Sequence, residues 1–153
     1  MNNITFVMIK PDAVEKNAVY AIMRYFYDNG ISVCCFDVQQ ATSERVTLHY
    51  GEHFERLGQD FANRMLELFV GKTVIPIVLT GEEGIIAKVR GIVGVTEPVK
   101  AAKGTIRGDL GDGDSFERSE RENRVLRNLI HASDTPEAVA REAHIWLPGY
   151  PIQ

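Results

Sequence analysis

The sequence predicts an α+β fold of the ferredoxin-like, split βαβ type: a four-stranded antiparallel sheet with helices packed over one face. Two observations lead to this class. Short runs of β-forming residues alternate with segments whose apolar residues recur at helical spacing, in the order β-α-β-α-α-β-α-β. In addition, the 153 residues are 44% hydrophobic and 25% charged, a composition typical of a globular domain. We therefore expect residues 1–153 to form a single domain.

The first part of the chain supplies two strands and a helix. Residues 4–9 are rich in β-forming side chains and are predicted to form a buried strand. Apolar residues recur at helical spacing over 18–29, and Gly30 follows where a C-terminal cap is expected. Residues 31–39 are predicted to form the second strand.

The middle of the chain supplies two short helices, a strand and a further helix. The helices are expected at 43–53, with Ser43 as N-cap, and at 60–69. Residues 74–79 are predicted to form the third strand, although Pro76 argues against a fully paired central position because proline has no N–H. A helix is expected over 82–93.

The last part contains a long irregular region, a strand and a helix. Residues 96–127 are rich in glycine and charge, and a loop of that length is expected to be functional or partly disordered. Residues 128–134, Asn-Leu-Ile-His-Ala-Ser-Asp, supply the fourth strand. Thr135 as N-cap and Pro136 at the first helical position predict the final helix, which ends near residue 147.

His131 is thereby placed at a strand-to-helix corner, where the positive end of a helix could lie near a bound phosphate. A lone histidine beside apolar residues is more often a hydrogen-bonded structural residue than a catalyst. The interpretation of His131 therefore depends on whether the rest of the chain supplies partners.

Three basic residues are candidates for such partners. Lys10 follows the first strand, and Arg90 and Arg107 have glycine neighbours that allow a ligand to approach the backbone. A guanidinium matches the geometry of phosphate oxygens, but each residue alone is more often a surface charge. The chain has neither a Walker-type loop nor a G-x-G-x-x-G fingerprint, so any phosphate must be held by scattered side chains.

Two patterns suggest metal sites, and we disfavour both. His49-Tyr50-Gly51-Glu52-His53 fits the H-x-x-E-H pattern of a class of zinc peptidases, but Gly51 interrupts the helix that this site needs and no further ligand is evident. The acidic cluster over 109–114 does not fit the calcium-loop spacing and is interpreted as a solvated loop.

The overall composition excludes several function classes. A net charge of −4 disfavours a nucleic-acid partner. We find no signal peptide and no segment long enough to span a membrane, so we expect a cytoplasmic protein without a membrane partner. Cys34 and Cys35 are adjacent and build no disulfide framework; they are interpreted as small apolar residues on a strand.

Four separated motifs together resemble the nucleoside diphosphate kinase family. They are Ile-Lys-Pro-Asp-Ala-Val at 9–14, His49-Tyr50, Gly-Thr-Ile-Arg-Gly-Asp at 104–109, and the stretch at 128–134. The similarity extends from about residue 4 to residue 146 in the family's order. The family's fold is also the ferredoxin-like plan expected from the element order.

The resemblance implies a ping-pong transfer of the γ-phosphate from a nucleoside triphosphate, typically ATP, to a nucleoside diphosphate. His131 matches the nucleophile that becomes a phosphohistidine, and a neutral imidazole suits this role near pH 7. Glu142 matches the glutamate that orients the other ring nitrogen, and Ser133 matches the serine beside that pair.

The resemblance also implies a set of nucleotide contacts. Phosphates would be bound by Lys10, Arg90, Thr96 and Arg107, the ribose 3′-hydroxyl by Asn128, and Tyr50 would line the site. Phe61 matches the aromatic that stacks on the base; it also shares a helical stripe with Met65 and Leu68, so a core role stays open. Mg²⁺ is expected to enter with the nucleotide, held by its phosphates.

Two departures from the family's common form concern the surroundings of His131. About a dozen extra residues, around 111–127, could reshape the nucleotide cleft or a subunit contact. Ala132 replaces a more common glycine and would exclude a positive φ there. A catalytically weak nucleotide-binding or protein-interaction module is therefore the alternative to an active kinase. Family membership also implies a homo-oligomer, a hexamer or tetramer built from dimers.

Overall fold

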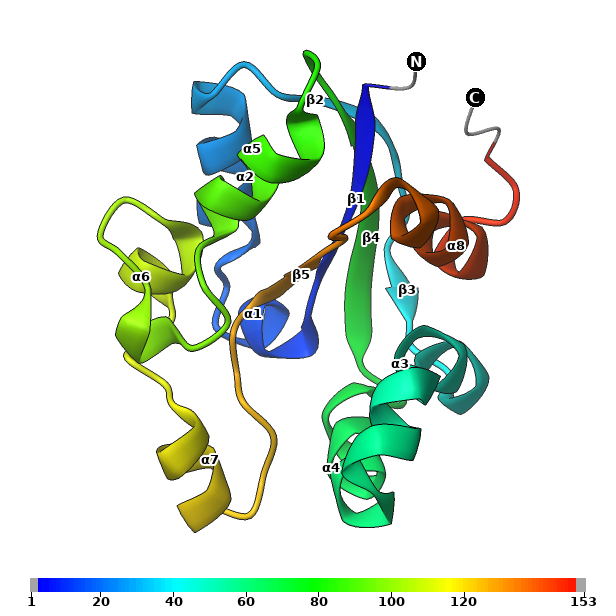
Figure 1. The fold of residues 1–153 in the computed structure, drawn as a ribbon, viewed down its shortest axis with the longest axis vertical. Coiled ribbons are helices and arrows are strands. Elements are labelled where there is room, and N and C mark those ends of the chain that lie inside the picture. Colours follow the sequence, from blue (N-terminus) through cyan, green and yellow to red (C-terminus); the bar gives the residue numbers. More distant parts are fainter. Residues whose placement is uncertain (1–2, 151–153) are drawn as a thin grey trace.

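In the computed structural model, which describes residues 3–150, the chain forms an antiparallel sheet flanked by helices (Figure 1). The sheet order is β2-β4-β1-β5, and β3 pairs with β4 beside β2. The strands are β1 (Ile4–Ile9), β2 (Ser32–Phe36), β3 (Gln39–Gln40), β4 (Thr73–Thr80) and β5 (Ile130–Ala132). The predicted α+β class and antiparallel sheet are confirmed. The predicted number of four strands was wrong for the described residues, because the segment over 31–39 is broken into β2 and β3.

Pro76 lies in the interior of this sheet, contrary to the expectation from its missing N–H. It pairs in register with Met8 of β1. On the other side of β4, the Pro76 carbonyl accepts a hydrogen bond from the Asp37 N–H at 3.2 Å. The nitrogen of Pro76 lies on the same side of β4 as its carbonyl, so it faces the break between β2 and β3. Within residues 3–150, no strand residue there needs a hydrogen bond from the N–H that proline lacks.

The longer helices follow the apolar periodicity of the sequence. They are α2 (Val19–Asp28), α3 (Ser43–Leu57), α4 (Gln59–Phe69), α5 (Ile85–Val93) and α8 (Pro136–Trp146). Helix α3 is capped by Thr42, whose Oγ1 accepts from the Arg45 N–H, rather than by the predicted Ser43. Gly84 adopts a φ of 82° directly before α5, which explains why the helix begins after it. Helix α1 (Pro11–Glu15) was not predicted. Within residues 3–150, no helix has the length and apolar character needed to cross a bilayer.

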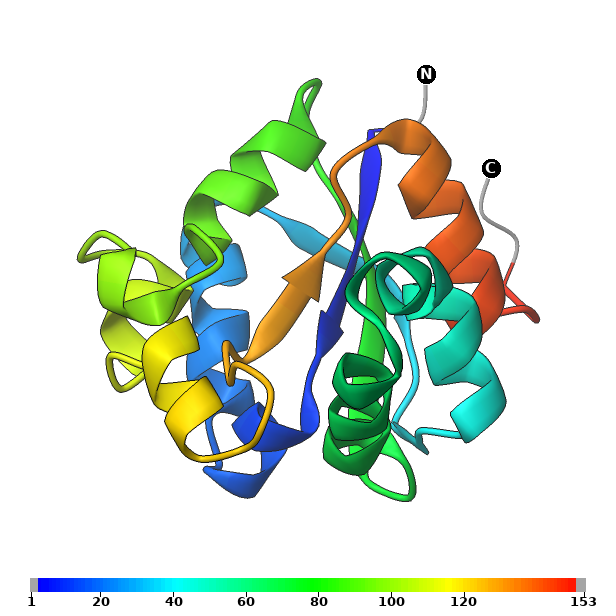
Figure 2. The same cartoon turned by 60° about the horizontal axis from the view of Figure 1, so that its bottom comes forward.

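Helices cover both faces of the sheet, so the expected one-sided arrangement was wrong (Figure 2). Successive residues of β1 point to opposite faces, as strand geometry requires. Val7 and Ile9 pack in a cluster with residues of α2 and α5. Phe6 and Met8 pack in a second cluster with residues of α3, α4 and α8. A strand buried on both faces explains why residues 6–9 form a continuous apolar run.

The region over 96–127 is ordered into short helices, so its prediction as irregular was wrong. It contains a 3₁₀ turn η1 (Pro98–Lys100), α6 (Ile106–Leu110) and α7 (Phe116–Arg121). Thr105 and Ser115 cap α6 and α7 by accepting from N–H groups three residues on. These helices were missed because each is too short to show an apolar period.

A buried carboxylate organises the segment over 111–127. Asp114 is 3% exposed and accepts two hydrogen bonds from Arg124, at 2.8 and 2.9 Å, and one from the Arg127 N–H. At the surface, Glu120 of α7 lies 3.1 Å from Arg64 of α4. This contact joins the two helices that face each other in the lower part of Figure 1.

Candidate functional site

A cleft of about 640 Å³ lies between α3, α5, β5 and α8. It is lined by all the site residues predicted from sequence except Ser133 and Phe61. The side chains come from segments that are far apart in the chain, and the sheet brings them together: His131 lies in the middle of β5, in register with Met8 of β1.

His131 and Glu142 form the central contact of the cleft. Nε2 of His131 lies 2.7 Å from Oε2 of Glu142, which projects from the buried face of α8. Ser133 Oγ donates to the same carboxylate oxygen. Burial by itself would raise the pKa of the Glu142 carboxyl, but hydrogen bonds from His131 and Ser133 hold that pKa below its usual value.

The ionised carboxylate determines which nitrogen of His131 keeps a free lone pair. Because Glu142 can then only accept, the neutral imidazole carries its proton on Nε2 and keeps the lone pair on Nδ1. The corner after β5 fixes this arrangement. Thr135 Oγ1 accepts from the Ala138 N–H, and Pro136 is at the start of α8, as the sequence predicted. Helix α8 therefore starts in a direction that places Glu142 beside His131.

Lys10 lies immediately after β1 with its ammonium group in the cleft. The side chain is buried, and Nζ donates to Oδ1 of Asn128 at 2.8 Å. Burial lowers the pKa of Lys10 to about 8; Asp12 opposes this shift and Arg107 adds to it. A phosphate beside Lys10 would restore full charge to the ammonium group. Asn128 itself is held by a hydrogen bond from Nδ2 to the Thr96 carbonyl.

Arg107 organises the backbone around the cleft. Its guanidinium donates to the carbonyls of Gly94, Asn128 and Ile130. Burial lowers the pKa of Arg107 to about 10, so it is charged at neutral pH. A Cβ on the adjacent Gly108 would lie 2.0 Å from the Ala102 carbonyl oxygen, so only glycine fits there. Arg90 similarly donates to the Ala132 carbonyl at 3.1 Å.

Leu129, between Asn128 and β5, has a φ of 74° although it is not glycine. Such a conformation costs roughly 1–2 kcal/mol. It is held by two hydrogen bonds: the Leu129 N–H donates to Asp12 Oδ2, and its carbonyl accepts from the Lys10 N–H. Asp12 was not predicted as a site residue; its position in the first turn after Pro11, within the motif at 9–14, was the available signal.

His49, which belongs both to the zinc-peptidase pattern and to the His49-Tyr50 family motif but was given no role of its own, also lies in this site. His49 is buried, and its ring centroid lies 4.4 Å from that of His131 in an edge-on arrangement. The potential ligand atoms of His49, His131 and Glu142 lie within 4.8 Å of one another, and this group does not include Glu52 or His53. The H-x-x-E-H pattern therefore does not assemble as a unit. Tyr50 is buried as well, and its ring centroid lies 6.2 Å from that of His131.

The structure shows the surroundings of Phe61 and Ala132. Phe61 of α4 packs edge-on against Phe54 at 6.1 Å, which is the core contact kept open in the sequence analysis. Ala132 lies in β5 and is not among the described residues with a positive φ, so its methyl group meets no backbone constraint. The unusual backbone is at Leu129 instead.

A family model described as nucleoside diphosphate kinase matches residues 3–152. The nucleoside diphosphate kinase of Microcystis aeruginosa is 37% identical over 142 residues, covering 93% of this chain and 85% of that protein. That of Nocardia farcinica is 33% identical over 153 residues, covering 99% of both.

Solved structures agree with these sequence relationships. A transition state mimic of the nucleoside diphosphate kinase of Borrelia burgdorferi, with bound vanadate and ADP, has a TM-score of 0.89 at 28% identity and covers 98% of this chain and 89% of that one. An NDP kinase from Pyrobaculum aerophilum has a TM-score of 0.83 at 26% identity, covering 96% of both.

Proposed function

Since the chain belongs to the nucleoside diphosphate kinase family and is a phosphotransferase, we propose that His131 carries the phosphoryl group from a nucleoside triphosphate to a nucleoside diphosphate. The observation that carries this assignment is the 2.7 Å contact from Glu142 to Nε2 of His131, which leaves Nδ1 as the nucleophile. Residues 1–153 would act as one domain.

In the first half-reaction, Nδ1 of His131 attacks the γ-phosphorus. The bond from that phosphorus to the bridging oxygen breaks, and the nucleoside diphosphate leaves with the electron pair. The imidazole ring gains positive charge, which the Glu142 carboxylate offsets while it retains the Nε2 proton on the ring. Ser133 fixes the carboxylate. The second half-reaction is the reverse, with a different diphosphate as acceptor.

The cationic side chains of the cleft would bind the phosphates. Lys10, Arg90 and Arg107 all line it, and stabilising charge on the transferred group is the main requirement of phosphoryl transfer. Thr96 would complete the phosphate site, Tyr50 would line the cleft, and Asn128 would contact the ribose 3′-hydroxyl.

Mg²⁺ would arrive as part of the nucleotide substrate. The side chains at the proposed phosphate site are mainly cations and neutral donors, and Mg²⁺ prefers oxygen ligands. Phosphate oxygens and water would therefore supply its ligands, and the ion would neutralise charge on the phosphates.

The base would stack on Phe61. This assignment is supported by the position of Phe61 on the α3–α4 hairpin that also carries Tyr50, and by its incomplete burial. An aromatic face accepts any base, which suits a broad range of nucleoside tri- and diphosphates.

A homo-oligomer built from dimers, either a hexamer or a tetramer, is the proposed assembly. Strand β2 is at the edge of the sheet, and Val33, Phe36 and Val38 on and after it are exposed. An exposed apolar edge strand is suited to pairing with a second copy. A cytoplasmic location is supported by the free thiols of Cys34 and Cys35, and the net charge of −4 supports function without nucleic acid.

The alternative of a catalytically weak module receives no support from the inserted segment. Residues 111–127 do not contribute to the lining of the cleft in the described chain. The candidate nucleophile, its carboxylate and the cations are all present beside it.

The decisive experiment uses purified protein with γ-labelled ATP and a deoxynucleoside diphosphate. The wild type should form an acid-labile phosphoenzyme and transfer the label, and His131→Asn should lose both by at least about a thousandfold. Retained transfer in His131→Asn would exclude His131 as the carrier.

A further inference from the structure

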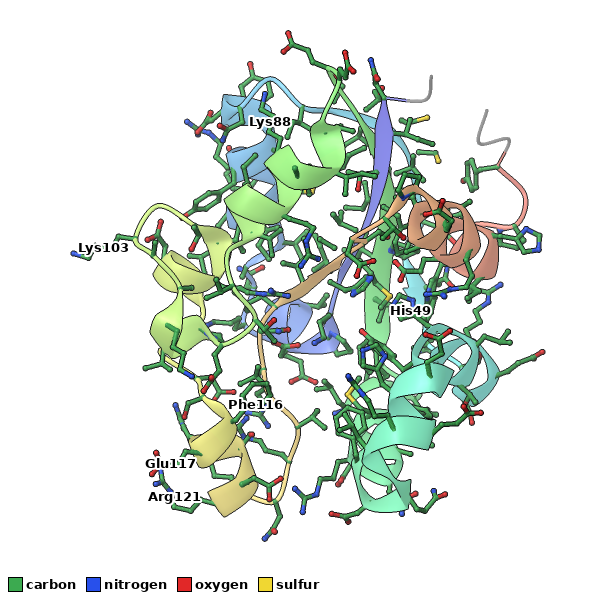
Figure 3. The ribbon with its side chains drawn as sticks, viewed as in Figure 1. His49, Lys88, Lys103, Phe116, Glu117 and Arg121 are labelled. Atoms are coloured by element: carbon green, nitrogen blue, oxygen red, sulfur yellow. The ribbon has the colours of Figure 1, made fainter. Side chains whose placement is uncertain are left out.

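His49 of α3, labelled in Figure 3, has two ring nitrogens in different surroundings. Its Nδ1 accepts a hydrogen bond from the Trp146 indole Nε1–H at 2.9 Å. Its Nε2 is buried and has no hydrogen-bond partner in the described chain. The side chain is 1% exposed, so water does not compensate for this in the folded protein.

The contact with Trp146 fixes the tautomer of His49. An indole N–H can only donate, so Nδ1 must carry a lone pair, and the proton of the neutral ring is on Nε2. Burial also holds the pKa of His49 well below its ordinary value, which keeps the ring neutral at physiological pH. The unsatisfied atom is therefore an N–H donor.

This donor points at the carboxylate that orients the nucleophile. Nε2 of His49 lies 3.9 Å from Oε1 of Glu142, just beyond hydrogen-bond distance. The other oxygen, Oε2, already binds His131 and Ser133. A small rotation of the carboxylate would bring Oε1 within reach of the His49 donor.

We propose that His49 is a positioning residue for phosphoryl transfer, whose Nε2–H, fixed by Trp146, donates to Oε1 of Glu142 as His131 is phosphorylated. The inference rests on the proposed role of His131. When Nδ1 attacks, the imidazole gains positive charge and its Nε2 proton is drawn toward the carboxylate. A further donor on the carboxylate stabilises it as an anion, so the proton stays on His131 and the ring keeps its orientation.

The same tautomer of His49 disfavours metal binding by a group of side chains that has the spacing of a metal site. His49, His131 and Glu142 place three possible ligand atoms within 4.8 Å of one another. A metal ligand must offer a lone pair, whereas Nε2 of His49 carries a proton. Binding a cation there would require breaking the Trp146 hydrogen bond and leaving a buried indole N–H without a partner.

The test compares the single-turnover rate of phosphoenzyme formation in variants of the full chain. His49→Leu removes the donor and should slow this rate about tenfold, the effect of one hydrogen bond to an ionised group, with nucleotide KM changed less than twofold. His49→Gln, whose amide nitrogen is at the same bond distance from Cβ as Nε2, should stay within about threefold of wild type. His144→Gln, on the exposed face of α8, is the matched control and should react at the wild-type rate.

Two outcomes of these rates would overturn the inference: wild-type rates in His49→Leu, or equal slowing in His49→Leu and His49→Gln. If His49→Leu does not fold, His49→Phe combined with Trp146→Phe removes both ends of the hydrogen bond and leaves no orphaned donor there. That double variant should be slowed about tenfold, and a wild-type rate would equally exclude the role. A wild type that forms no phosphoenzyme would instead contradict the proposed function.

Zinc chloride provides a readout that a purely structural role would not change. In Trp146→Phe, Nδ1 of His49 can take the proton, and Nε2 then presents a lone pair beside His131 and Glu142. Calorimetric titration of nucleotide-free protein should show zinc binding at least about tenfold tighter in Trp146→Phe than in wild type. Equal affinities would show that Trp146 does not fix the tautomer.

Discussion

Oε2 of Glu142 lies 2.7 Å from Nε2 of His131, and this one contact selects Nδ1 as the free nitrogen of the ring. The two residues are eleven positions apart, one in β5 and the other on the buried face of α8. Their contact therefore depends on how α8 packs against the sheet, and it leads to the first prediction.

Glu142→Gln should slow phosphoenzyme formation by about a hundredfold or more, because an amide that donates to Nε2 favours the tautomer with the proton on Nδ1. Nucleotide KM should change little. Rapid-quench measurement with γ-labelled ATP checks the rate, with Glu67→Gln on the exposed face of α4 as the control. Near-normal rates in Glu142→Gln would refute the tautomer argument.

Nucleotide binding should weaken above pH 8 through Lys10. Burial lowers the pKa of Lys10 to about 8, so its ammonium charge is present below that pH and is lost as pH rises through it. The KM for a nucleoside diphosphate should rise about fivefold between pH 8 and pH 9. In Lys10→Gln the KM should already be high at pH 7 and vary much less. A flat profile in wild type would contradict this assignment.

The Asp114–Arg124 pair should make the free energy of unfolding of the protein depend on pH in the acid range. Burial would raise the pKa of Asp114, but hydrogen bonds from Arg124 and the Arg127 N–H hold it below its usual value. A lowered carboxyl pKa contributes stability that is present above about pH 4 and is lost as pH falls through the folded-state value. Asp114→Asn should lower the free energy of unfolding by about 2 kcal/mol at pH 7.

Urea denaturation of the wild type and Asp114→Asn at pH 7 and pH 3 measures this effect. The difference between the two proteins should shrink at pH 3, because the Asp114 carboxyl of the unfolded chain becomes protonated below about pH 4 and the stability linked to its lowered folded-state pKa begins to be lost. Glu117→Gln, an exposed residue of α7, is the control and should lower stability by less than about 0.5 kcal/mol. A difference that is constant with pH would show that the ion pair is not responsible.

Ala132→Gly should restore the residue common in the family without improving catalysis. Ala132 lies in a strand and needs no positive φ, so glycine adds backbone freedom to the unfolded chain and removes a buried methyl group. We expect a loss of about 1 kcal/mol in the free energy of unfolding and a turnover rate within twofold of wild type. A large gain in turnover would show that the methyl group obstructs the nucleophile.

Local patterns predicted much of the fold because the physical causes are local. The apolar period of α2 and α4 and the Thr135–Pro136 start of α8 are visible in the sequence alone. Helices α6 and α7 are stabilised by caps and by the buried Asp114 rather than by an apolar stripe, so no periodicity could reveal them. The expectation that Pro76 would not lie in a central strand was wrong for a related reason. The neighbouring strand is interrupted beside Pro76, so the missing N–H of proline leaves no ladder hydrogen bond of the described sheet unmade.

The sequence by itself determined the antiparallel α+β class, most helix positions and the motif residues of the site, because strand propensity, helical spacing and capping act over a few neighbouring residues. Only the tertiary structure decided which nitrogen of His131 is free, how Asp12 holds the positive φ of Leu129, and what His49 contacts. Trp146 lies 97 positions from His49 in the chain. Hydrogen bonds between residues so far apart depend on the packing of helices on the sheet, which no local pattern encodes.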